Sequence, residues 1–265
     1  AYLEGGSTYF VHDYVDAEKK AAFIHVDYER AGYSRSLDKD CYREFDRIFT
    51  VSDEVKQSFL NVYPECSGRT YVFHNLINQE EIRRKAELPG GFEDSYDGKR
   101  ILTVGRLTAQ KAYEFSIDAM KLLKDHGVKA RWYVLGEGEL REKLQFKINK
   151  LGLKDDFILM GARENPFPYY KECDLYVHAS RFEGKSIAIQ EAQTLGCTLV
   201  VSDCSGNREQ VEPGVDGMMC RLDAKEICDT VEALLKDEEK CRKLGKKAAE
   251  KSFLEDKDVL KPFDF

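Results

Sequence analysis

A regular alternation of short apolar runs with amphipathic segments, beginning near residue 100, constrains the fold most strongly. Runs that suit buried strands fall at residues 100–107, 129–135, 156–161, 175–179, 198–202 and 218–222. Segments with helical periodicity lie between them or after them, at residues 112–127, 140–151, 166–173 and 186–195 and in two further stretches ending near residue 253. Strands separated by such helices favour right-handed crossovers and a parallel sheet covered on both faces. We therefore expect an α/β, Rossmann-like domain that binds ligands beyond the carboxyl ends of its strands.

A segment without periodicity precedes this pattern. Residues 88–99 combine a Pro-Gly-Gly turn with a polar run, so we place a domain boundary between residues 98 and 99. The first part is also mixed α/β, with candidate strands at residues 2–3, 20–25, 47–51 and 70–73 and candidate helices at residues 9–15, 38–45 and 53–62. Because this is too little for a complete doubly wound domain, we expect residues 1–98 to form a partial, truncated α/β domain beside the C-terminal domain of residues 99–265.

Composition excludes several classes of protein. The chain has 265 residues and a net charge of −7, which argues against general nucleic-acid binding. Its apolar runs fall short of the roughly 20 residues that a membrane span needs. We expect no signal peptide in these residues, and because the sequence opens at Ala1 an upstream segment stays open. The eight cysteines have no C-x-x-C spacing, so we expect them to be reduced and structural, in a cytoplasmic protein without a metal site.

Residues 105–111 (GRLTAQK) form the loop after the first strand of the C-terminal domain. Arg106 and Lys111 flank the turn into a helix, whose positive dipole end suits a diphosphate. Taken alone this pattern is weak, because a solvated Arg and Lys beside a helix start would look the same.

Residues 180–186 (SRFEGKS) follow a later strand and lead into a helix. Gly184 lets the backbone approach a ligand, and Ser186 can cap the helix. Glu183 and Glu191 are separated by about two helical turns, roughly 10–12 Å, so they could bind two hydroxyl-bearing rings on either side of a diphosphate. The bare pair is common in an acidic chain; the strand–E-G-x-S–helix setting favours the functional interpretation.

These segments resemble the signatures of retaining glycosyltransferase family 4, which has the GT-B fold of two facing Rossmann-like domains. Glu183 and Glu191 match its E-x7-E signature, and residues 105–111 match G-R-L-x-x-x-K. The resemblance is dense over residues 100–253 and looser over residues 20–85.

Two further segments carry the resemblance, and one position departs from it. Residues 165–169 (NPFPY) with Asp174 are similar to the N-P-Y-P-Y…D segment of polysaccharide-building members, and residues 203–209 (DCSGNRE) resemble a D-x-x-G-x-x-E loop. The residue after Lys111 is Ala112, where the family usually has Gly, and we expect this to tighten the loop without abolishing phosphate contact.

The resemblance implies a role for each matching position. Arg106 and Lys111 would bind the donor diphosphate and stabilise charge on the leaving group, with Glu183 on the donor sugar and Glu191 on the ribose hydroxyls. The other positions implied in donor binding are Gly105; Gly161, Ala162 and Arg163 beside the nucleobase; and Gly184, Lys185, Ser186 and Ile187 beside the sugar. Family members need no metal, so we interpret the two D-x-D strings, at residues 38–40 and 256–258, as solvated faces.

The first part of the chain carries weaker signals. His25 ends an apolar strand and resembles a family histidine that points into the cleft beside the donor sugar. For His178 packing is favoured, and the turn at residues 4–8 (EGGST) could approach an anion. Residues 82–85 (IRRK) could contact an anionic membrane surface, although a short cationic helix end is favoured.

Two hypotheses of function remain open. The first is a retaining hexosyltransferase that moves a sugar from a UDP- or GDP-sugar, UDP favoured, to a glycan or lipid-linked acceptor, in the cytoplasm or at the inner face of the membrane. The second is a donor-binding fragment, or half of a two-chain transferase, that cannot transfer alone. The second follows because members of the family are usually longer, which leads us to expect that the N-terminal, acceptor-side half is incomplete.

Overall fold

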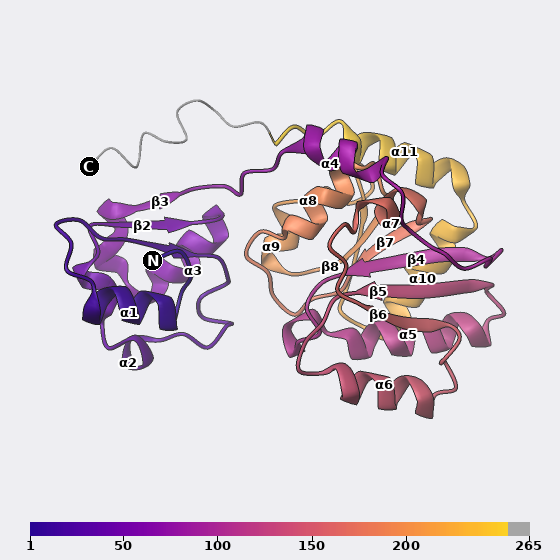
Figure 1. Ribbon diagram of the computed structural model, residues 1–265, viewed down its shortest axis with the longest axis horizontal. Helices are drawn as coiled ribbons and strands as arrows, with labels where there is room; N and C mark the ends of the chain where they lie inside the picture. The colour runs from indigo at the N-terminus through magenta and orange to yellow at the C-terminus, as the bar shows by residue number, and fades with distance from the viewer. Residues whose placement is uncertain (254–265) are drawn as a thin grey trace.

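A computed structural model describes residues 1–253 and shows two α/β units joined by an extended linker (Figure 1). The expected α/β class with parallel sheets is confirmed, because every strand pair in both sheets is parallel. The first unit contains a three-stranded sheet in the order β1-β2-β3, and the second a six-stranded sheet in the order β6-β5-β4-β7-β8-β9. The predicted D-x-D string at residues 256–258 lies outside the described residues.

The first unit has short elements around an aromatic core. Its elements are α1 (Gly6–Tyr14), β1 (Ala21–Ile24), α2 (Arg35–Asp38), the 3-10 helix η1 (Cys41–Glu44), β2 (Arg47–Thr50), α3 (Asp53–Val62), the 3-10 helix η2 (Pro64–Arg69) and β3 (Thr70–Val72). The fully buried rings of Tyr28, Tyr42, Phe59 and Tyr63 pack mostly edge to face, a favourable arrangement for aromatic side chains. Three of the four predicted strands are present; residues 2–3 form none.

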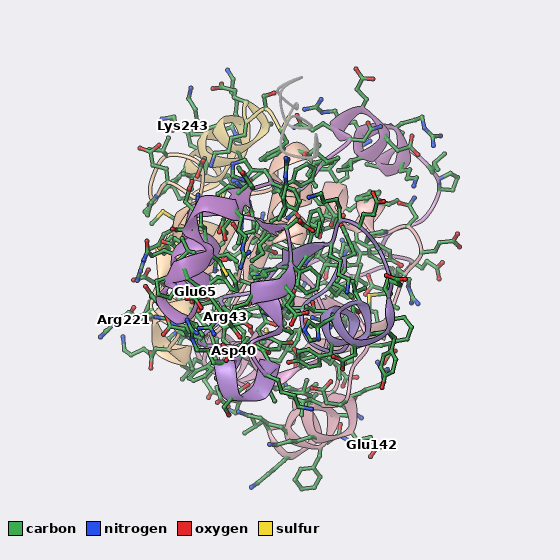
Figure 2. The ribbon with its side chains drawn as sticks, turned by 90° about the vertical axis from the view of Figure 1, so that its left-hand side faces the viewer. Asp40, Arg43, Glu65, Glu142, Arg221 and Lys243 are labelled. Atoms are coloured by element: carbon green, nitrogen blue, oxygen red, sulfur yellow. The ribbon has the colours of Figure 1, made fainter. Side chains whose placement is uncertain are left out.

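The prediction that residues 38–40 form a solvated face is wrong for Asp38. This carboxylate is buried and accepts hydrogen bonds from the hydroxyls of Tyr9 and Tyr28. Asp40 instead lies on the surface in an ion-pair cluster with Arg43, Arg35 and Glu65 (Figure 2). The two aspartates therefore have separate structural partners.

The second unit follows the predicted alternation closely. Its elements are β4 (Lys99–Val104), the 3-10 helix η3 (Ala109–Lys111), α5 (Tyr113–Asp125), β5 (Ala130–Leu135), α6 (Arg141–Lys150), β6 (Phe157–Gly161), α7 (Phe167–Glu172), β7 (Leu175–His178), α8 (Ile187–Thr194), β8 (Leu199–Ser202), α9 (Ser205–Arg208), β9 (Met218–Cys220), α10 (Ala224–Leu235) and α11 (Glu238–Ala249). Alternate strand residues point to opposite faces, so Ile101 packs under α5, α6 and α10 while Leu102 packs under α7 and α8. These two apolar layers fix the sheet between its helices.

Strand order places two loops side by side. The chain builds β4, β5 and β6 outward in one direction, then crosses back so that β7 pairs with β4 on its other side, with Ile101 opposite Leu175. Ligands of open parallel sheets bind beyond the carboxyl ends of the strands, where the strand order reverses. The loops after β4 and β7 therefore define the expected position of a site.

The linker contains one helix that belongs in space to the second unit. Helix α4 (Gln79–Ala86) packs against α7 and α8, and Asn165 donates a hydrogen bond to the carbonyl of Lys85 (Figure 1). Its Ile82 is buried and its last turn carries Arg83, Arg84 and Lys85, so the favoured short cationic helix end is confirmed, and contact with a membrane surface stays a prediction. The division between residues 98 and 99 stays a prediction.

None of the helices in residues 1–253 combines the length and the apolar character that crossing a membrane would require.

Candidate functional site

The loops after β4 and β7 bring a lysine and a glutamate into direct contact. Lys111 Nζ lies 2.6 Å from Glu183 Oε1, and the two side chains are 14% and 6% exposed. Glu183 Oε1 also accepts hydrogen bonds from Ser180 Oγ at 2.5 Å and from His178 Nε2 at 3.0 Å. Burial alone would raise the pKa of the Glu183 carboxyl, but Lys111 and His178 hold it well below its usual value. Glu183 is therefore an ionised, nearly desolvated carboxylate.

Backbone conformation sets the position of Lys111. η3 ends at Lys111, and the next residue, Ala112, has a left-handed conformation with φ 47° and precedes α5 without a side-chain capping hydrogen bond. Glycine adopts this conformation freely, whereas an alanine there costs on the order of 1 kcal/mol. The departure from the family's usual glycine thus retains the turn at some cost in strain.

A cavity of about 350 Å³ lies between the two units beside this pair. It is lined from the second unit by Arg106, which is exposed and has no carboxylate within ion-pair distance among residues 1–253. Residues of the predicted site that line it are Gly105, Arg106, Lys111, Glu183, Gly184, Lys185, Ser186, Ile187 and His25. The structure therefore brings together nine of the predicted positions, from both units.

The cavity has one wall in the first unit. His25 donates its backbone N–H to Glu4 Oε2 at 3.0 Å, and its ring Nδ1 lies 3.4 Å from the same oxygen. Burial alone would raise the pKa of the Glu4 carboxyl, but its hydrogen bonds with His25 hold it below its usual value. Glu4 lines the cavity too, although the sequence singled it out only as part of a turn.

Gly184 is a point of close approach between the two units. A Cβ on Gly184 would lie 2.0 Å from the carbonyl oxygen of His25, so no larger residue fits without separating the units. Nearby, Asn75 Nδ2 donates to the carbonyl of Lys185 at 2.9 Å, and the amide of Glu54 donates to Glu209 Oε1 at 2.8 Å. The E-G-x-S motif thus supplies both a carboxylate and a close contact between the two units.

The N-terminus of α8 opens on the same cavity. Its N-cap residue Ser186 makes no side-chain capping hydrogen bond, and both Ser186 and Ile187 line the cavity. The unsatisfied backbone N–H groups of a helix start favour a negatively charged or oxygen-rich ligand.

Glu191 lies one helical turn after Ile187 on α8 but is not among the cavity-lining residues. Its carboxylate accepts a hydrogen bond from Tyr170 OH at 3.0 Å. Burial raises the pKa of this carboxyl, and the bond from Tyr170 opposes the shift only in part. Glu191 is therefore a partly buried carboxylate with one neutral hydrogen-bond donor.

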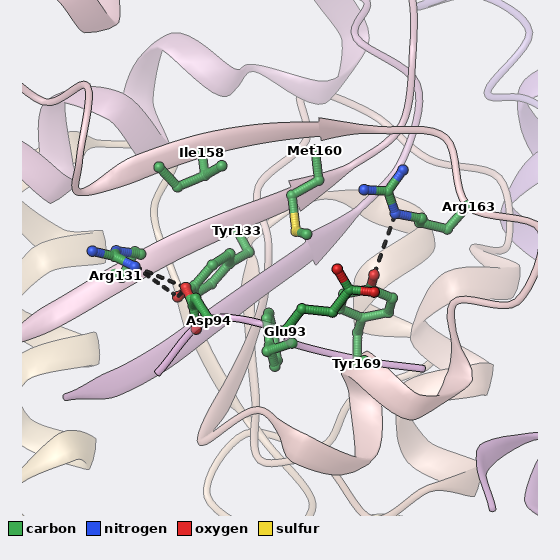
Figure 3. A pocket seen from close by; sticks show the side chains of 10 residues that line it. Glu93, Asp94, Arg131, Tyr133, Ile158, Met160, Arg163 and Tyr169 are labelled. Atoms are coloured by element: carbon green, nitrogen blue, oxygen red, sulfur yellow. Dashed lines mark hydrogen bonds and ion pairs between the residues drawn. The ribbon is translucent and has the colours of Figure 1, made fainter. Parts of the chain in front are cut away.

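Arg163 lines a different cavity. This second cavity, of about 630 Å³, lies between residues 91–94, β5 and β6, and Figure 3 shows the Arg163 side chain directed toward Tyr169. Arg163 Nε donates to Tyr169 OH at 3.2 Å. Gly161 ends β6, and neither it nor Ala162 lines the cavity between the units. The nucleobase role of these three positions stays a prediction.

His178 has a different setting from the one the sequence favoured. It is buried as a packing residue would be, yet its Nε2 lies 3.3 Å from Lys111 Nζ as well as beside Glu183. Gln110, inside the G-R-L-x-x-x-K loop, also reaches Glu183 Oε2 at 3.4 Å. Sequence reasoning missed both contacts; for Gln110 its place beside Lys111 was the available signal.

A group that could hold a metal ion lies away from this cavity. Within the described residues, His126, Cys228 and Glu232 offer ligand atoms within 4.8 Å of one another, and none of them lines the cavity. All eight cysteines are free.

Comparison with known proteins by sequence gives three findings. A family model described as "Glycosyl transferases group 1" matches residues 80–251. An uncharacterized glycosyltransferase of Methanocaldococcus jannaschii is 30% identical over 179 residues, covering 65% of this chain and 43% of that protein. The N-acetylgalactosamine-N,N'-diacetylbacillosaminyl-diphospho-undecaprenol 4-alpha-N-acetylgalactosaminyltransferase of Campylobacter jejuni is 30% identical over 210 residues, 78% of this chain and 55% of that protein. The chain spans about half the length of these curated relatives.

Solved structures resemble the chain over most of its length. TarM of S. aureus, in complex with Fondaparinux, alpha-GlcNAc-glycerol and UDP, gives a TM-score of 0.74 at 16% identity and covers 92% of this chain and 50% of TarM. HepE of Anabaena, in complex with UDP and glucose, gives 0.73 at 18% identity and covers 87% of this chain and 66% of HepE. At these identities the likeness shows the fold alone, and it confirms the expected GT-B type.

Proposed function

The chain belongs to the group 1 glycosyl transferases, and from this premise we propose that it binds a nucleoside-diphosphate sugar between its two units and serves as the donor side of a retaining hexosyltransferase. One observation carries the proposal. A single cavity is lined by Arg106 and Lys111 from the loop after β4, by Glu183 from the loop after β7, and by His25 from the first unit. Cations, a carboxylate and an open helix start are the groups that a diphosphate joined to a sugar requires.

The proposed roles follow from charge. Arg106 lacks a carboxylate partner among the described residues, so its guanidinium is available to the diphosphate. Lys111 is held by Glu183 and would share its charge between that carboxylate and the phosphate nearest the sugar. Both cations stabilise the negative charge that grows on the diphosphate as the bond from the anomeric carbon to its oxygen breaks.

The sugar and the nucleoside have separate contacts. The backbone N–H groups of Lys185 through Ile187 at the start of α8 and the Glu183 carboxylate would bind sugar hydroxyls. Glu191, the next carboxylate along α8, would bind the ribose hydroxyls, with Gly161, Ala162 and Arg163 beside the base. The acceptor hydroxyl would form the new bond to the anomeric carbon and pass its proton to the departing diphosphate, without a metal ion.

The names of relatives and the ligands of similar structures support the finer choices. TarM and HepE were solved with UDP, which favours a UDP-sugar over a GDP-sugar. Two Campylobacter jejuni relatives are named alpha-transferases that act on diphospho-undecaprenol sugars, which supports retention and a lipid-linked or glycan acceptor. We also propose a cytoplasmic location, at the inner face of the membrane where the acceptor is lipid-linked.

A second candidate is a donor-binding module that does not transfer alone. It is favoured by the fact that the chain spans about half the length of the curated relatives it matches. Both candidates require nucleoside-diphosphate binding, and only the first requires turnover by this chain.

Calorimetric titration with UDP, GDP and ADP tests the proposal. We expect UDP to bind most tightly, and the Arg106→Ala and Glu191→Gln variants to lose about tenfold in affinity, the worth of one charge-assisted contact. The matched controls are Arg221→Ala and Glu142→Gln, two exposed positions outside the cavity, which should leave affinity unchanged (Figure 2). Absence of binding by the parent chain would overturn the proposal. Equal losses in the controls would overturn the residue assignments.

Turnover separates the two candidates. Hydrolysis of UDP-glucose or UDP-N-acetylglucosamine, or transfer of its sugar, measured by the release of UDP, would show that the chain acts by itself. Binding of UDP with no release of UDP from any donor, with or without glycan acceptors, would favour the module.

A further inference from the structure

His178 is a buried titratable residue to which the proposed function gives no task. It is the last residue of β7, 1% exposed, beside the loop that carries Glu183. Its Nδ1 lies 3.1 Å from Tyr176 OH, and its Nε2 lies 3.0 Å from Glu183 Oε1. Each ring nitrogen thus has a polar partner in the core.

The partners determine where the ring proton resides. Burial and the Lys111 ammonium lower the pKa of His178, with Glu183 opposing them, so the ring is neutral and carries one proton. An ionised carboxylate only accepts hydrogen bonds, so the nitrogen facing Glu183, Nε2, must be the donor. Burial raises the pKa of the Tyr176 phenol well above its usual value, so its hydroxyl keeps a proton to donate to Nδ1.

The two oxygens of Glu183 are occupied unequally. Oε1 accepts from Lys111 Nζ, Ser180 Oγ and His178 Nε2 at 2.6, 2.5 and 3.0 Å. Oε2 has one hydrogen bond among the described residues, the 3.4 Å contact from Gln110 Nε2. Since a carboxylate has about four lone-pair positions, Oε2 retains the capacity to accept from a ligand hydroxyl.

We propose that His178, fixed by Tyr176 as the Nε2–H tautomer, is a positioning residue that holds Oε1 of Glu183 in place and leaves Oε2 free for a hydroxyl of the donor sugar. The proposal rests on the proposed function, because it requires a sugar in the cavity. A neutral donor is suited to this place, since a charged imidazolium would repel Lys111 at 3.3 Å. Without His178, only the hydrogen bonds from Ser180 and Gln110 would oppose a rotation that offers both oxygens of Glu183 to the lysine.

The tautomer is tested without any ligand. Long-range 1H–15N spectra of the 15N-histidine-labelled chain should show one histidine, absent in His178→Gln, with a protonated Nε2 and an unprotonated Nδ1. It should stay neutral at pH values below the usual pKa of a histidine, because burial and Lys111 lower the pKa of His178. Tyr176→Phe should shift its Nδ1 resonance. A protonated Nδ1 or a doubly protonated ring at neutral pH would overturn the proposal.

The positioning role is tested by the part of the affinity that comes from the sugar. UDP-glucose, UDP-N-acetylglucosamine and GDP-mannose are each titrated against the free nucleoside diphosphate, with the parent chain, His178→Leu and His178→Gln. In His178→Leu we expect the affinity gained from the sugar to fall roughly tenfold while nucleoside-diphosphate affinity stays within twofold. His178→Gln should recover most of it, because its amide N–H can reach Glu183.

The outcomes are distinguishable. If nucleoside diphosphates do not bind the parent chain, the proposed function fails, and the tautomer still decides whether His178 donates to Glu183. If they bind and both variants keep the full contribution of the sugar, the positioning role fails and the proposed function stands. If His178→Leu does not fold, Tyr176→Phe gives the decision: loss of the sugar contribution supports tautomer control, and full retention overturns the positioning role.

Discussion

The ion pair between Lys111 and Glu183 makes a strong prediction about stability. The atoms are 2.6 Å apart, and the side chains are 14% and 6% exposed. At an effective dielectric constant of about 20, two unit charges at that distance attract by roughly 6 kcal/mol, and desolvation of the two ions offsets much of this. The pair should therefore add little net stability, but removing one partner should be costly.

Glu183→Gln removes the negative charge while keeping the side-chain shape. It leaves Lys111 desolvated without a counter-ion, so we expect the free energy of unfolding to fall by about 3 kcal/mol. Lys111→Met should cost a similar amount, because Glu183 would keep only neutral donors. The double variant should cost little more than either single variant, which gives a coupling energy of about 2–3 kcal/mol.

The chain offers a convenient probe for this cycle. Trp132 is its single tryptophan and is fully buried in the second unit, so its fluorescence in urea reports unfolding of the unit that carries the pair. Glu142→Gln and Lys243→Met, both exposed, are the matched controls and should change stability by less than about 0.5 kcal/mol (Figure 2). Single variants indistinguishable from these controls, with coupling below about 0.5 kcal/mol, would refute the desolvated ion pair.

Three further outcomes follow from the same cavity. Because the pKa of Glu183 is lowered in the folded state, its ionisation contributes stability that is present above the unfolded-state pKa near 4.5 and is lost as the pH falls below that value. In urea titrations between pH 5.5 and 3.5, the free energy of unfolding should therefore fall less for Glu183→Gln than for the parent chain. Burial raises the pKa of Glu191, so its ionised form destabilises the folded state above that pKa. The free energy of unfolding of Glu191→Gln, followed by Trp fluorescence at pH 7, should therefore rise by about 0.5–1 kcal/mol. A decrease would contradict a buried, destabilising carboxylate. In Gly184→Ala the new Cβ would lie 2.0 Å from the carbonyl oxygen of His25, so the contact must open by at least 1.0 Å, to 3.0 Å, and amide hydrogen exchange across the interface should become faster. The control is Gly68→Ala, whose Cβ meets no atom within 4 Å. Equal exchange in the two variants would contradict the close contact.

Local patterns in the sequence were sufficient to predict most of the second unit. The predicted helix at residues 112–127 is α5 (Tyr113–Asp125), and the predicted strand at residues 175–179 is β7 (Leu175–His178). Apolar periodicity determines which face of each element is buried, and that signal is local. The position of the motif loops at strand ends also followed, because a parallel sheet places all of its carboxyl ends on one edge.

Contacts that depend on strand order or on long-range pairing could not be predicted. Nothing local in the sequence states that β7 pairs with β4, yet this pairing brings Lys111 to Glu183. Asp38 was misread for the same reason: its hydrogen-bond donor Tyr9 lies 29 residues earlier, so a charged run concealed a buried carboxylate. The interdomain contact of Gly184 with His25 likewise appears only when both units are placed.

The energetics of the cavity argue for a ligand more strongly than any one residue does. Lys111 and Glu183 are desolvated charges, and a buried ion pair is often no better for stability than apolar side chains of the same volume. Partial burial disfavours the ionised form of Glu191, and Ala112 has a left-handed conformation that glycine would adopt without strain. Glu191 and Ala112 cost the free protein stability and the Lys111–Glu183 pair adds little, while the pair itself lines one cavity with the exposed Arg106. A diphosphate sugar would offset several of these costs at once, by giving Arg106 and Lys111 an anion and Glu183 a hydroxyl, so saturating UDP-sugar should raise the urea midpoint of the second unit more than it raises that of Glu183→Gln.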